Sequence, residues 1–212
     1  DRYWDAWAGK GRMEKELGQL SVAEKSYEKS ITVYPGYENG YFGLGLVKES
    51  RRDLAGAAET YRRGLADNPG SLPLAFRLAV VETTLGRETA AADWARALQI
   101  APGSPPTRAG YATWLLDQGR IDEARRQARE ALRRDPAFVS ALRTIAAADG
   151  RESRFFAEGL AREKVFRLTG AAEDRAELER VAQLDEGYRR RLGTLRETLD
   201  RPGRPSPQSS PR

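Results

Sequence analysis

A chain of 212 residues can form one domain with a tail, and its composition excludes several chemistries. The absence of cysteine excludes disulfides and thiol catalysis, and the absence of histidine removes the commonest general base and metal ligand. We therefore predict a protein that is not an enzyme and that uses no cofactor and no metal.

The formal net charge of +5 overstates how basic the body of the chain is. The last residues, 201–212, contain three arginines and no acid, and removing these three from the 36 basic residues leaves 33 against 31 acidic ones. A nearly neutral body lacks the basic stripe that is typical of a nucleic-acid-binding surface. We therefore predict no nucleic-acid partner.

The beginning of the chain already reads as part of a helix, with Tyr3 and Trp4 directly after Asp1 and Arg2. Two aromatic residues at the start of a helix suggest a piece of a longer protein, in which case a targeting signal would lie upstream. The compartment, cytoplasmic or periplasmic, is not predicted, because a chain without cysteine suits both. No apolar run is long enough to span a membrane, so we expect no membrane contact by this segment.

Four prolines divide the chain at nearly constant intervals. Pro35, Pro69, Pro102 and Pro136 follow one another at spacings of 34, 33 and 34 residues. A fixed period of this length is typical of a solenoid built from repeated helix pairs. Each unit reads as two short amphipathic helices, and the second helix ends before the proline because proline cannot donate the next backbone hydrogen bond.

The same residue types recur at the same positions in each unit, counted from Trp4 in the first, Glu38 in the second and Pro105 in the fourth. Small residues at positions 8 and 20 predict close contact between the paired helices, and larger ones at 4, 7 and 24 fill the space beside it. Glycines between the helices suit a turn with positive φ. The recurring residues are Trp7, Gly11, Gly18, Ala23 and Tyr27, then Tyr41, Leu44, Gly45, Ala57 and Tyr61, then Leu78, Gly86, Ala90, Trp94 and Ala97, then Tyr111, Ala112, Gly119, Ala124, Ala128 and Ala131.

This pattern resembles the tetratricopeptide repeat (TPR), a helix-turn-helix unit of 34 residues. The resemblance covers about residues 4–138 and predicts a domain of four repeats over 1–138, at about 4–37, 38–70, 71–104 and 105–138. It implies an all-α fold, a right-handed α-solenoid of stacked helix pairs with capping helices at the C-terminal end.

Beyond Pro136 the pattern weakens. Residues 139–170 read as a degenerate fifth repeat, in which Gly150 is expected to break the first helix early. Residues 171–200 read as one further helix with an apolar stripe, which either caps the last repeat or forms a short dimeric coiled coil. We favour the cap, and therefore a monomer. Residues 201–212 are rich in proline, serine and arginine, and we predict a disordered tail.

The resemblance also implies which side chains face the concave side, at positions 2, 5, 6, 9, 12 and 13 of each repeat. These positions supply an apolar floor with nearby arginines, a combination common in interface hot spots. Glycines at position 6 (Gly9, Gly43 and Gly110) are expected to leave the groove wide. The alternative is that the phenylalanines pack between repeats and contact no partner. The candidate partner-binding residues are Arg12, Phe42, Leu46, Phe76, Arg77, Thr113 and Arg143.

The resemblance favours a non-enzymatic scaffold that binds a partner protein or peptide on the concave face, as a module of a larger bacterial protein. The alternative is an accessory domain of a larger bacterial enzyme, such as a membrane glycosyltransferase. The TPR subset that grips the C-terminal carboxylate of chaperone peptides needs a set of Lys, Asn and Arg residues. At the matching positions this chain has Ala8, Arg12, Gly43, Pro73 and Arg77, so only Arg77 agrees and that clamp is absent.

Overall fold

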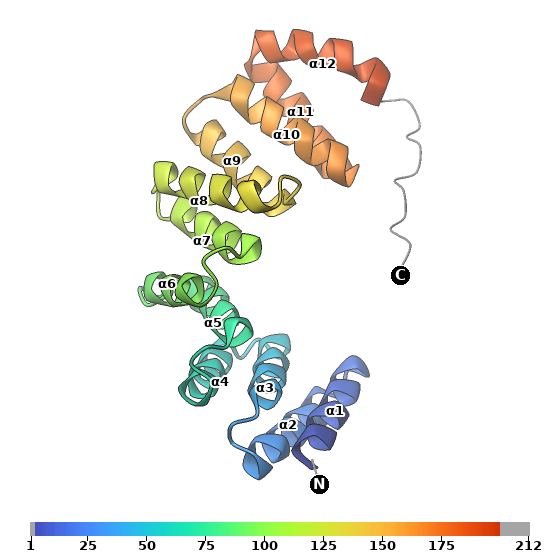
Figure 1. The fold of residues 1–212 in the computed structure, drawn as a ribbon. Coiled ribbons are helices and arrows are strands. Elements are labelled where there is room, and N and C mark those ends of the chain that lie inside the picture. The colour runs from blue at the N-terminus through green and yellow to red at the C-terminus, as the bar shows by residue number, and fades with distance from the viewer. Residues whose placement is uncertain (1–2, 200–212) are drawn as a thin grey trace. The chain divides into compact units, whose positions relative to one another are not determined.

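The computed structural model describes residues 3–199, and every regular element in that part of the chain is an α-helix (Figure 1). The predicted tail, 201–212, lies outside the described residues. None of the described helices is both long and apolar enough to cross a membrane. The helices are α1 (Tyr3–Glu16), α2 (Leu20–Val33), α3 (Glu38–Ser50), α4 (Leu54–Asp67), α5 (Leu72–Thr84), α6 (Ala90–Ile100), α7 (Pro105–Asp117), α8 (Ile121–Arg134), α9 (Val139–Arg151), α10 (Phe155–Thr169), α11 (Ala172–Leu184) and α12 (Glu186–Leu199).

Consecutive helices pack against each other, as the period of the sequence predicts. The chain forms two compact units, 1–110 and 111–212. In the first unit, α1 packs on α2, α3 on α4 and α5 on α6, and the first helices of neighbouring pairs also touch, α1 with α3 and α3 with α5. In the second unit, α8 packs on α9, α9 on α10 and α10 on α11. The predicted all-α repeat fold is confirmed.

Small residues hold the paired helices close together, as predicted. Ala23 and Ala57 are completely buried. A Cβ atom on Gly11 would lie 3.0 Å from the ring of Tyr27, and one on Gly45 would lie 2.2 Å from the ring of Tyr61. In the first two pairs the aromatic residue of the second helix therefore rests against a glycine of its own first helix, and a larger residue there would push the pair apart.

The turn within each pair places one residue in the left-handed region, and this feature extends beyond the fourth repeat. The three predicted glycines have positive φ, at 75° for Gly18, 66° for Gly86 and 74° for Gly119. The equivalent residues of the second and fifth pairs are not glycine, yet Arg52 has φ 62° and Ser153 has φ 57°. The fifth pair thus keeps the turn of the repeat although its sequence has lost the glycine.

The helix ends also follow the predicted period. In the first four pairs the second helix ends two residues before the repeated proline, at Val33, Asp67, Ile100 and Arg134. The residue that follows each of these helices adopts an extended or bridging conformation, for example Tyr34 at φ −143° and ψ 96°. A residue before a proline is disfavoured in the helical region, which accounts for the stop.

In the fifth pair, the prediction that Gly150 breaks the first helix is wrong, since α9 continues to Arg151. Gly150 instead makes room for a carboxylate, because a Cβ atom there would lie 2.8 Å from Oε2 of Glu158. Glu158 occupies the repeat position that Ala124 holds in the fourth pair, and it is 1% exposed. Its Oε1 accepts a hydrogen bond of 2.7 Å from Nε of Arg162.

The single helix expected over residues 171–200 is two helices, α11 and α12, which meet at Asp185. Asp185 is extended (φ −131°, ψ 117°), and its Oδ1 accepts a 2.6 Å hydrogen bond from the backbone N–H of Tyr188. An aspartate in this position satisfies the first turn of the next helix and competes with continuation of the previous one. The predicted apolar stripe therefore folds back on itself, with Leu178 and Leu192 in one buried cluster. The capping role stays a prediction.

Candidate functional site

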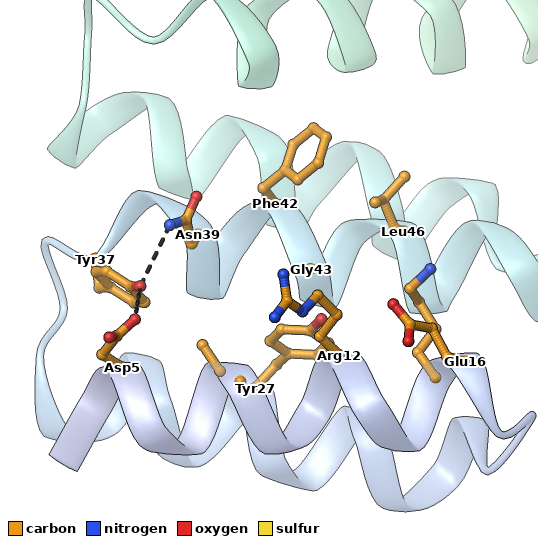
Figure 2. A pocket seen from close by; sticks show the side chains of 12 residues that line it. Asp5, Arg12, Glu16, Tyr27, Tyr37, Asn39, Phe42, Gly43 and Leu46 are labelled. Atoms are coloured by element: carbon orange, nitrogen blue, oxygen red, sulfur yellow. Dashed lines mark hydrogen bonds between the residues drawn. The ribbon is translucent and has the colours of Figure 1, made fainter. Parts of the chain in front are cut away.

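A groove of about 370 Å³ lies between α1 and α3, in the first unit (Figure 2). Ten of its twelve lining residues stand at the positions that the repeat pattern assigns to the concave face. The other two are Tyr27 and Tyr37. The ten are Asp5, Ala8, Gly9, Arg12, Lys15 and Glu16 on α1, and Asn39, Phe42, Gly43 and Leu46 on α3.

The floor of the groove is an aromatic ring seated on a glycine. Tyr27 of α2 is 4% exposed, and a Cβ atom on Gly43 would lie only 2.1 Å from its ring. The same arrangement recurs at Gly110, where a Cβ atom would lie 2.3 Å from the ring of Trp94. The prediction that these glycines widen the groove is therefore wrong at Gly43 and Gly110, because an aromatic side chain fills each space. At Gly9 a Cβ atom would meet nothing within 4 Å.

The middle of the groove combines a cation with apolar side chains. Arg12 is exposed and forms no ion pair with any described residue. Figure 2 shows it beside Tyr27, with Phe42 and Leu46 on the facing helix. Burial raises the pKa of Tyr27, and the positive charge of Arg12 acts in the opposite direction. Phe42 is half-buried against the core, and it is one of the residues that line the groove.

One end of the groove is fixed by a polar cluster. The hydroxyl of Tyr37 donates to Oδ1 of Asp5, and Nδ2 of Asn39 donates to the Tyr37 hydroxyl oxygen at 3.3 Å. Burial, and then the hydrogen bond to Asp5, raise the pKa of Tyr37, so this hydroxyl keeps its proton near neutral pH. The cluster ties α1 to the start of α3 and sets the width of the groove at that end.

Arg77 takes part in an internal network on α3, α4 and α5. Its Nε donates to Oε1 of Glu49 at 3.0 Å, its Nη2 donates to Oε2, and the buried Tyr61 also donates to this carboxylate. Burial opposes the charge on Arg77, but the hydrogen bonds with Glu49 outweigh it and raise the pKa of Arg77. A ligand carboxylate would have to compete with Glu49 for this guanidinium group.

Phe76 packs on the core of the third repeat. Its ring meets Trp94 edge to face, with 5.6 Å between the ring centroids and an interplanar angle of 83°. Trp94 is 2% exposed and donates from Nε1 to Oγ1 of Thr83 at 3.0 Å. Phe76 and Trp94 belong to the same repeat, so this contact lies within a helix pair and is not the expected alternative of packing between repeats. Part of the Phe76 side chain is still accessible.

The two remaining candidate residues belong to the second unit and are not placed relative to the groove. Thr113 is exposed, and its Oγ1 lies 3.2 Å from Oγ1 of Thr144. Arg143 is bound to Asp174 at 3.0 Å. Burial acts to raise the pKa of Asp174, but hydrogen bonds from Thr169 and Arg143 lower it overall. The structure thus gathers only Arg12, Phe42 and Leu46 in one groove.

Two groove residues, Tyr27 and Tyr37, were not predicted from the sequence. The repeat pattern assigns Tyr27 to the helix-pair joint, where it does lie, but its ring also reaches the next repeat through Gly43. The signal was available: an aromatic residue at position 24 is followed by a glycine at position 6 of the next repeat for Tyr27 and again for Trp94. Tyr37 lies just before α3, where the repeat pattern carries no residue preference.

Two family models match this chain, and both are described as tetratricopeptide repeats. One family model of this description matches residues 8–71 and again 42–105, and a second matches residues 87–148. Together the matches run from residue 8 to residue 148, which is more than half of the chain. A comparison with curated proteins finds no match.

Solved structures of similar fold have low sequence identity to this chain, and YrrB and TTC0263 among them are described as TPR proteins. YrrB, described as a TPR protein with an unusual peptide-binding site, is 16% identical, with a TM-score of 0.66 over 82% of this chain and 90% of YrrB. TTC0263, a thermophilic TPR protein of Thermus thermophilus, is 15% identical, with a TM-score of 0.66 over 84% of this chain and 98% of that protein. PilF of Pseudomonas aeruginosa is 16% identical, with a TM-score of 0.74 over 92% of this chain and 86% of PilF.

Three kinds of evidence therefore agree: the period of the prolines, the helix pairs joined by small residues, and the family matches over residues 8–148. The chain belongs to the tetratricopeptide repeat family.

Proposed function

We propose that the chain is a non-enzymatic scaffold that binds a short peptide segment of a partner protein in the groove between α1 and α3. The observation that carries the proposal is a cation without a partner beside apolar side chains: Arg12 forms no ion pair with a described residue, and Phe42 and Leu46 face the same hollow. An arginine beside an aromatic ring in a preformed hollow is the composition of interface hot spots. The ligand is a peptide with an aliphatic or aromatic side chain next to an acidic one.

The proposed site is smaller than the one expected from the sequence. Phe76 and Arg77 lie in the same unit, but Phe76 already packs against Trp94 and Arg77 is already hydrogen-bonded to Glu49. A ligand that binds Arg77 would have to replace its bidentate ion pair with Glu49. The free energy lost by breaking that pair is about as large as the free energy gained from the new contact. Arg12 requires no such exchange, so we place the acid-binding function there.

The family supports this assignment in general terms, since TPR proteins of similar fold include YrrB, whose description names a peptide-binding site. We further propose that the chain acts as a monomer. The apolar stripe of α11 and α12 is the surface that would otherwise form a coiled coil, and Leu178, Val181 and Leu192 lie in a buried cluster within the chain.

A display library of random peptides, panned on the intact chain, tests the proposal. We expect enrichment of sequences with an acid next to an apolar residue. For the best peptide, made synthetically, Arg12→Glu and Phe42→Ala should each weaken binding about tenfold or more, as hot-spot residues do. Lys29→Glu on the exposed side of α2 makes the same charge change outside the groove and is the matched control.

Melting temperatures of all three variants must be compared, because a loss of binding with a loss of fold would carry no information on the site. Phe42 is half-buried, so a modest decrease is expected for Phe42→Ala, and Arg12→Glu should melt like the parent. Enriched peptides that bind all the variants equally would contradict the proposal. An equal loss of affinity from Arg12→Glu and Lys29→Glu would also contradict it, since it would indicate nonspecific charge attraction.

A further inference from the structure

The first and third helix pairs carry a buried carboxylate at the same repeat position, late in the first helix of the pair. Glu14 lies four residues before Gly18, and Glu82 lies four residues before Gly86. In both pairs this glycine forms the positive-φ turn that leads into the second helix. Glu14 is 8% exposed and Glu82 is completely buried. The two carboxylates therefore occupy equivalent places, one where α1 meets α2 and one where α5 meets α6.

In the first pair a hydroxyl group of the second helix binds this carboxylate. Ser26, which directly precedes Tyr27, is 2% exposed and donates a hydrogen bond of 2.6 Å from Oγ to Oε2 of Glu14. A carboxylate withdrawn from water needs such donors, because its negative charge is costly to bury without them. A serine hydroxyl keeps its proton in water, so this donor is available at every pH.

In the third pair the residue equivalent to Ser26 is an acid. Asp93 directly precedes Trp94 as Ser26 precedes Tyr27. An ionised carboxylate only accepts hydrogen bonds, so Asp93 in this form has no donor to offer. Its Oδ2 is buried and has no hydrogen-bond partner among the described residues. The third pair thus has two carboxylates where the first pair has a donor and an acceptor.

Glu82 has more hydrogen-bond donors than Asp93. Its Oε1 accepts from Nη2 of Arg62 on α4 and, at 3.1 Å, from Nη1 of Arg87, and its Oε2 accepts from the hydroxyl of Thr89 at 2.8 Å. Thr89 also lies one helical turn before Asp93, since its carbonyl oxygen accepts from the backbone N–H of Asp93. Three donors stabilise the charge on Glu82, so a proton that enters this cluster binds Asp93.

The charges around Asp93 come from α4, α5 and α6. Glu82 of α5 contributes a negative charge, whereas Arg62 of α4 and Arg96 of α6 contribute positive ones. Arg62 is hydrogen-bonded to Glu82, and Arg96 donates to backbone carbonyl oxygens. Burial, and then the charge of Glu82, raise the pKa of Asp93, and the two arginines offset this only in part.

We infer that Asp93 makes the packing of α6 on α5 depend on pH: with a proton bound, its carboxyl group donates a hydrogen bond to Glu82. This bond is the counterpart of the one that Ser26 donates to Glu14. The ionised form instead leaves two negative charges at one joint. The inference concerns the third helix pair alone and does not depend on the proposed peptide groove.

Acid should stabilise this joint, in contrast to the ion-paired joints of the chain. At pH 7 the folded protein bears the cost of an ionised Asp93. Because the pKa of this group is raised in the folded state, the cost is relieved as the pH falls through the folded pKa, and the relief is complete below the ordinary value of 3.8. Asp174 acts in the opposite direction, since its pKa is lowered and its contribution is lost in acid.

A pH titration followed by ¹³C NMR tests the inference on the intact chain. The signal of the Asp93 carboxyl carbon is assigned by its absence from the spectrum of Asp93→Asn. We expect this carbon to titrate with a midpoint above 3.8. A midpoint at or below 3.8 would overturn the inference, because the ionised carboxylate would then be stabilised by the folded protein.

Urea unfolding at pH 7 and at about pH 4.5 measures what the proton contributes. Asp93→Asn keeps the shape and supplies an amide donor, and Asp93→Ser reproduces the residue of the first pair. At pH 7 both should lower the unfolding equilibrium constant relative to the parent, about tenfold for each pH unit by which the Asp93 midpoint is displaced. This gain should shrink toward pH 4.5. Glu88→Gln removes a charge from an exposed residue of the same turn and is the matched control, with an equally small effect at both pH values.

Two outcomes of the unfolding experiment would contradict the inference. A loss of stability at pH 7 in both Asp93 variants would show that the ionised carboxylate has a stabilising partner. A gain of the same size at both pH values would show that packing at residue 93 matters and that its proton does not.

Discussion

The joints of the first unit and the joint of the fifth helix pair solve the same packing problem with different side chains. In the first unit an aromatic ring rests on a glycine, as Tyr61 does on Gly45, and alanine lies beside it. In the fifth pair, Glu158 stands at the alanine position and is hydrogen-bonded to Arg162 and Arg180. The contact between a ring and a glycine involves few residues and recurs with the repeat pattern. The charged joint instead requires three particular residues, Glu158 and Arg162 on α10 and Arg180 on α11.

This difference predicts that single substitutions act differently in the two regions. Where a glycine lies under an aromatic ring, we expect any added side chain to disrupt the packing of the two helices, because it would overlap the ring. A charged joint fails when one partner is removed, because the others lose their hydrogen bonds.

The largest effect is expected for Gly43→Leu. The Cβ atom alone would lie 2.1 Å from the ring of Tyr27, so the ring or α3 must move, at a cost of about 3 kcal/mol of unfolding free energy. Gly9→Leu makes the same change at the equivalent position of α1, where the space is open, and should be neutral or slightly stabilising. Urea unfolding followed by circular dichroism compares the two. Equal losses of unfolding free energy in the two variants would show that the absence of a side chain at Gly43 does not determine how α2 packs on α3.

Removal of the buried carboxylate by Glu158→Ala should cost about 2 kcal/mol, because two arginines lose an acceptor in a buried joint. The cost is moderated because Arg162 and Arg180 both also contact Glu177, at 3.2 and 3.0 Å. Glu130→Ala removes a more exposed pair with Arg133 and should cost less than about 0.5 kcal/mol. If both variants unfold at the same urea concentration, Glu158 does not hold the fifth pair together.

A smaller effect of opposite sign is expected at the turns. Arg52 and Ser153 adopt φ of 62° and 57°, where a Cβ atom is strained. Arg52→Gly and Ser153→Gly should each stabilise the protein by about 0.5–1 kcal/mol, in spite of the greater chain entropy that glycine adds to the unfolded state. Gly86→Ala, at φ 66°, should destabilise it by about 1 kcal/mol. Thermal melting ranks the three variants, and stabilisation by Gly86→Ala would contradict the argument.

The sequence could predict the helix pairs and the turns because these depend on residues close together in the chain. Pro35 and Gly18, for example, act through their own backbone angles, and their effect needs no knowledge of the neighbours. The fifth pair is recognisable as degenerate because its glycine and alanine are replaced. That its turn survives at Ser153 could not be predicted, since a residue of that type adopts φ of 57° only when the packed helices on both sides impose it.

The candidate site was predictable only in part, for a related reason. Repeat positions indicate which side chains face the concave side, and Arg12, Phe42 and Leu46 do line the groove. They do not indicate which charges are already neutralised. Arg77 and Arg12 both stand at positions assigned to the concave side, but Glu49 binds the former, and no described residue forms an ion pair with the latter. Pairing between helices depends on side-chain reach, which a linear pattern does not contain.

The smallest expected effect compares two buried tyrosines, Tyr41 in the first unit and Tyr188 in the second. Burial raises the pKa of each to about 12, with the carboxylates of Asp67 and Glu163 adding to the shift. Tyr41 donates a 2.8 Å hydrogen bond to Asp67, whereas the hydroxyl of Tyr188 is buried without a partner among the described residues. Tyr41→Phe should therefore cost about 0.5 kcal/mol, and Tyr188→Phe should be neutral or stabilise by up to about 0.5 kcal/mol.

The pH dependence follows from the sign of these shifts. A tyrosine whose folded pKa exceeds the ordinary value of 10 stabilises the fold fully below pH 10, and this contribution is lost as the pH rises from 10 toward 12. Urea unfolding of the parent at pH 7, 9.5 and 10.5 should show a loss confined to the last step, and Tyr188→Phe should reduce it. A Tyr188→Phe variant that is less stable than Tyr41→Phe at pH 7 would mean that the hydroxyl of Tyr188 has a partner after all, and that the second unit, like the first, satisfies its buried tyrosine.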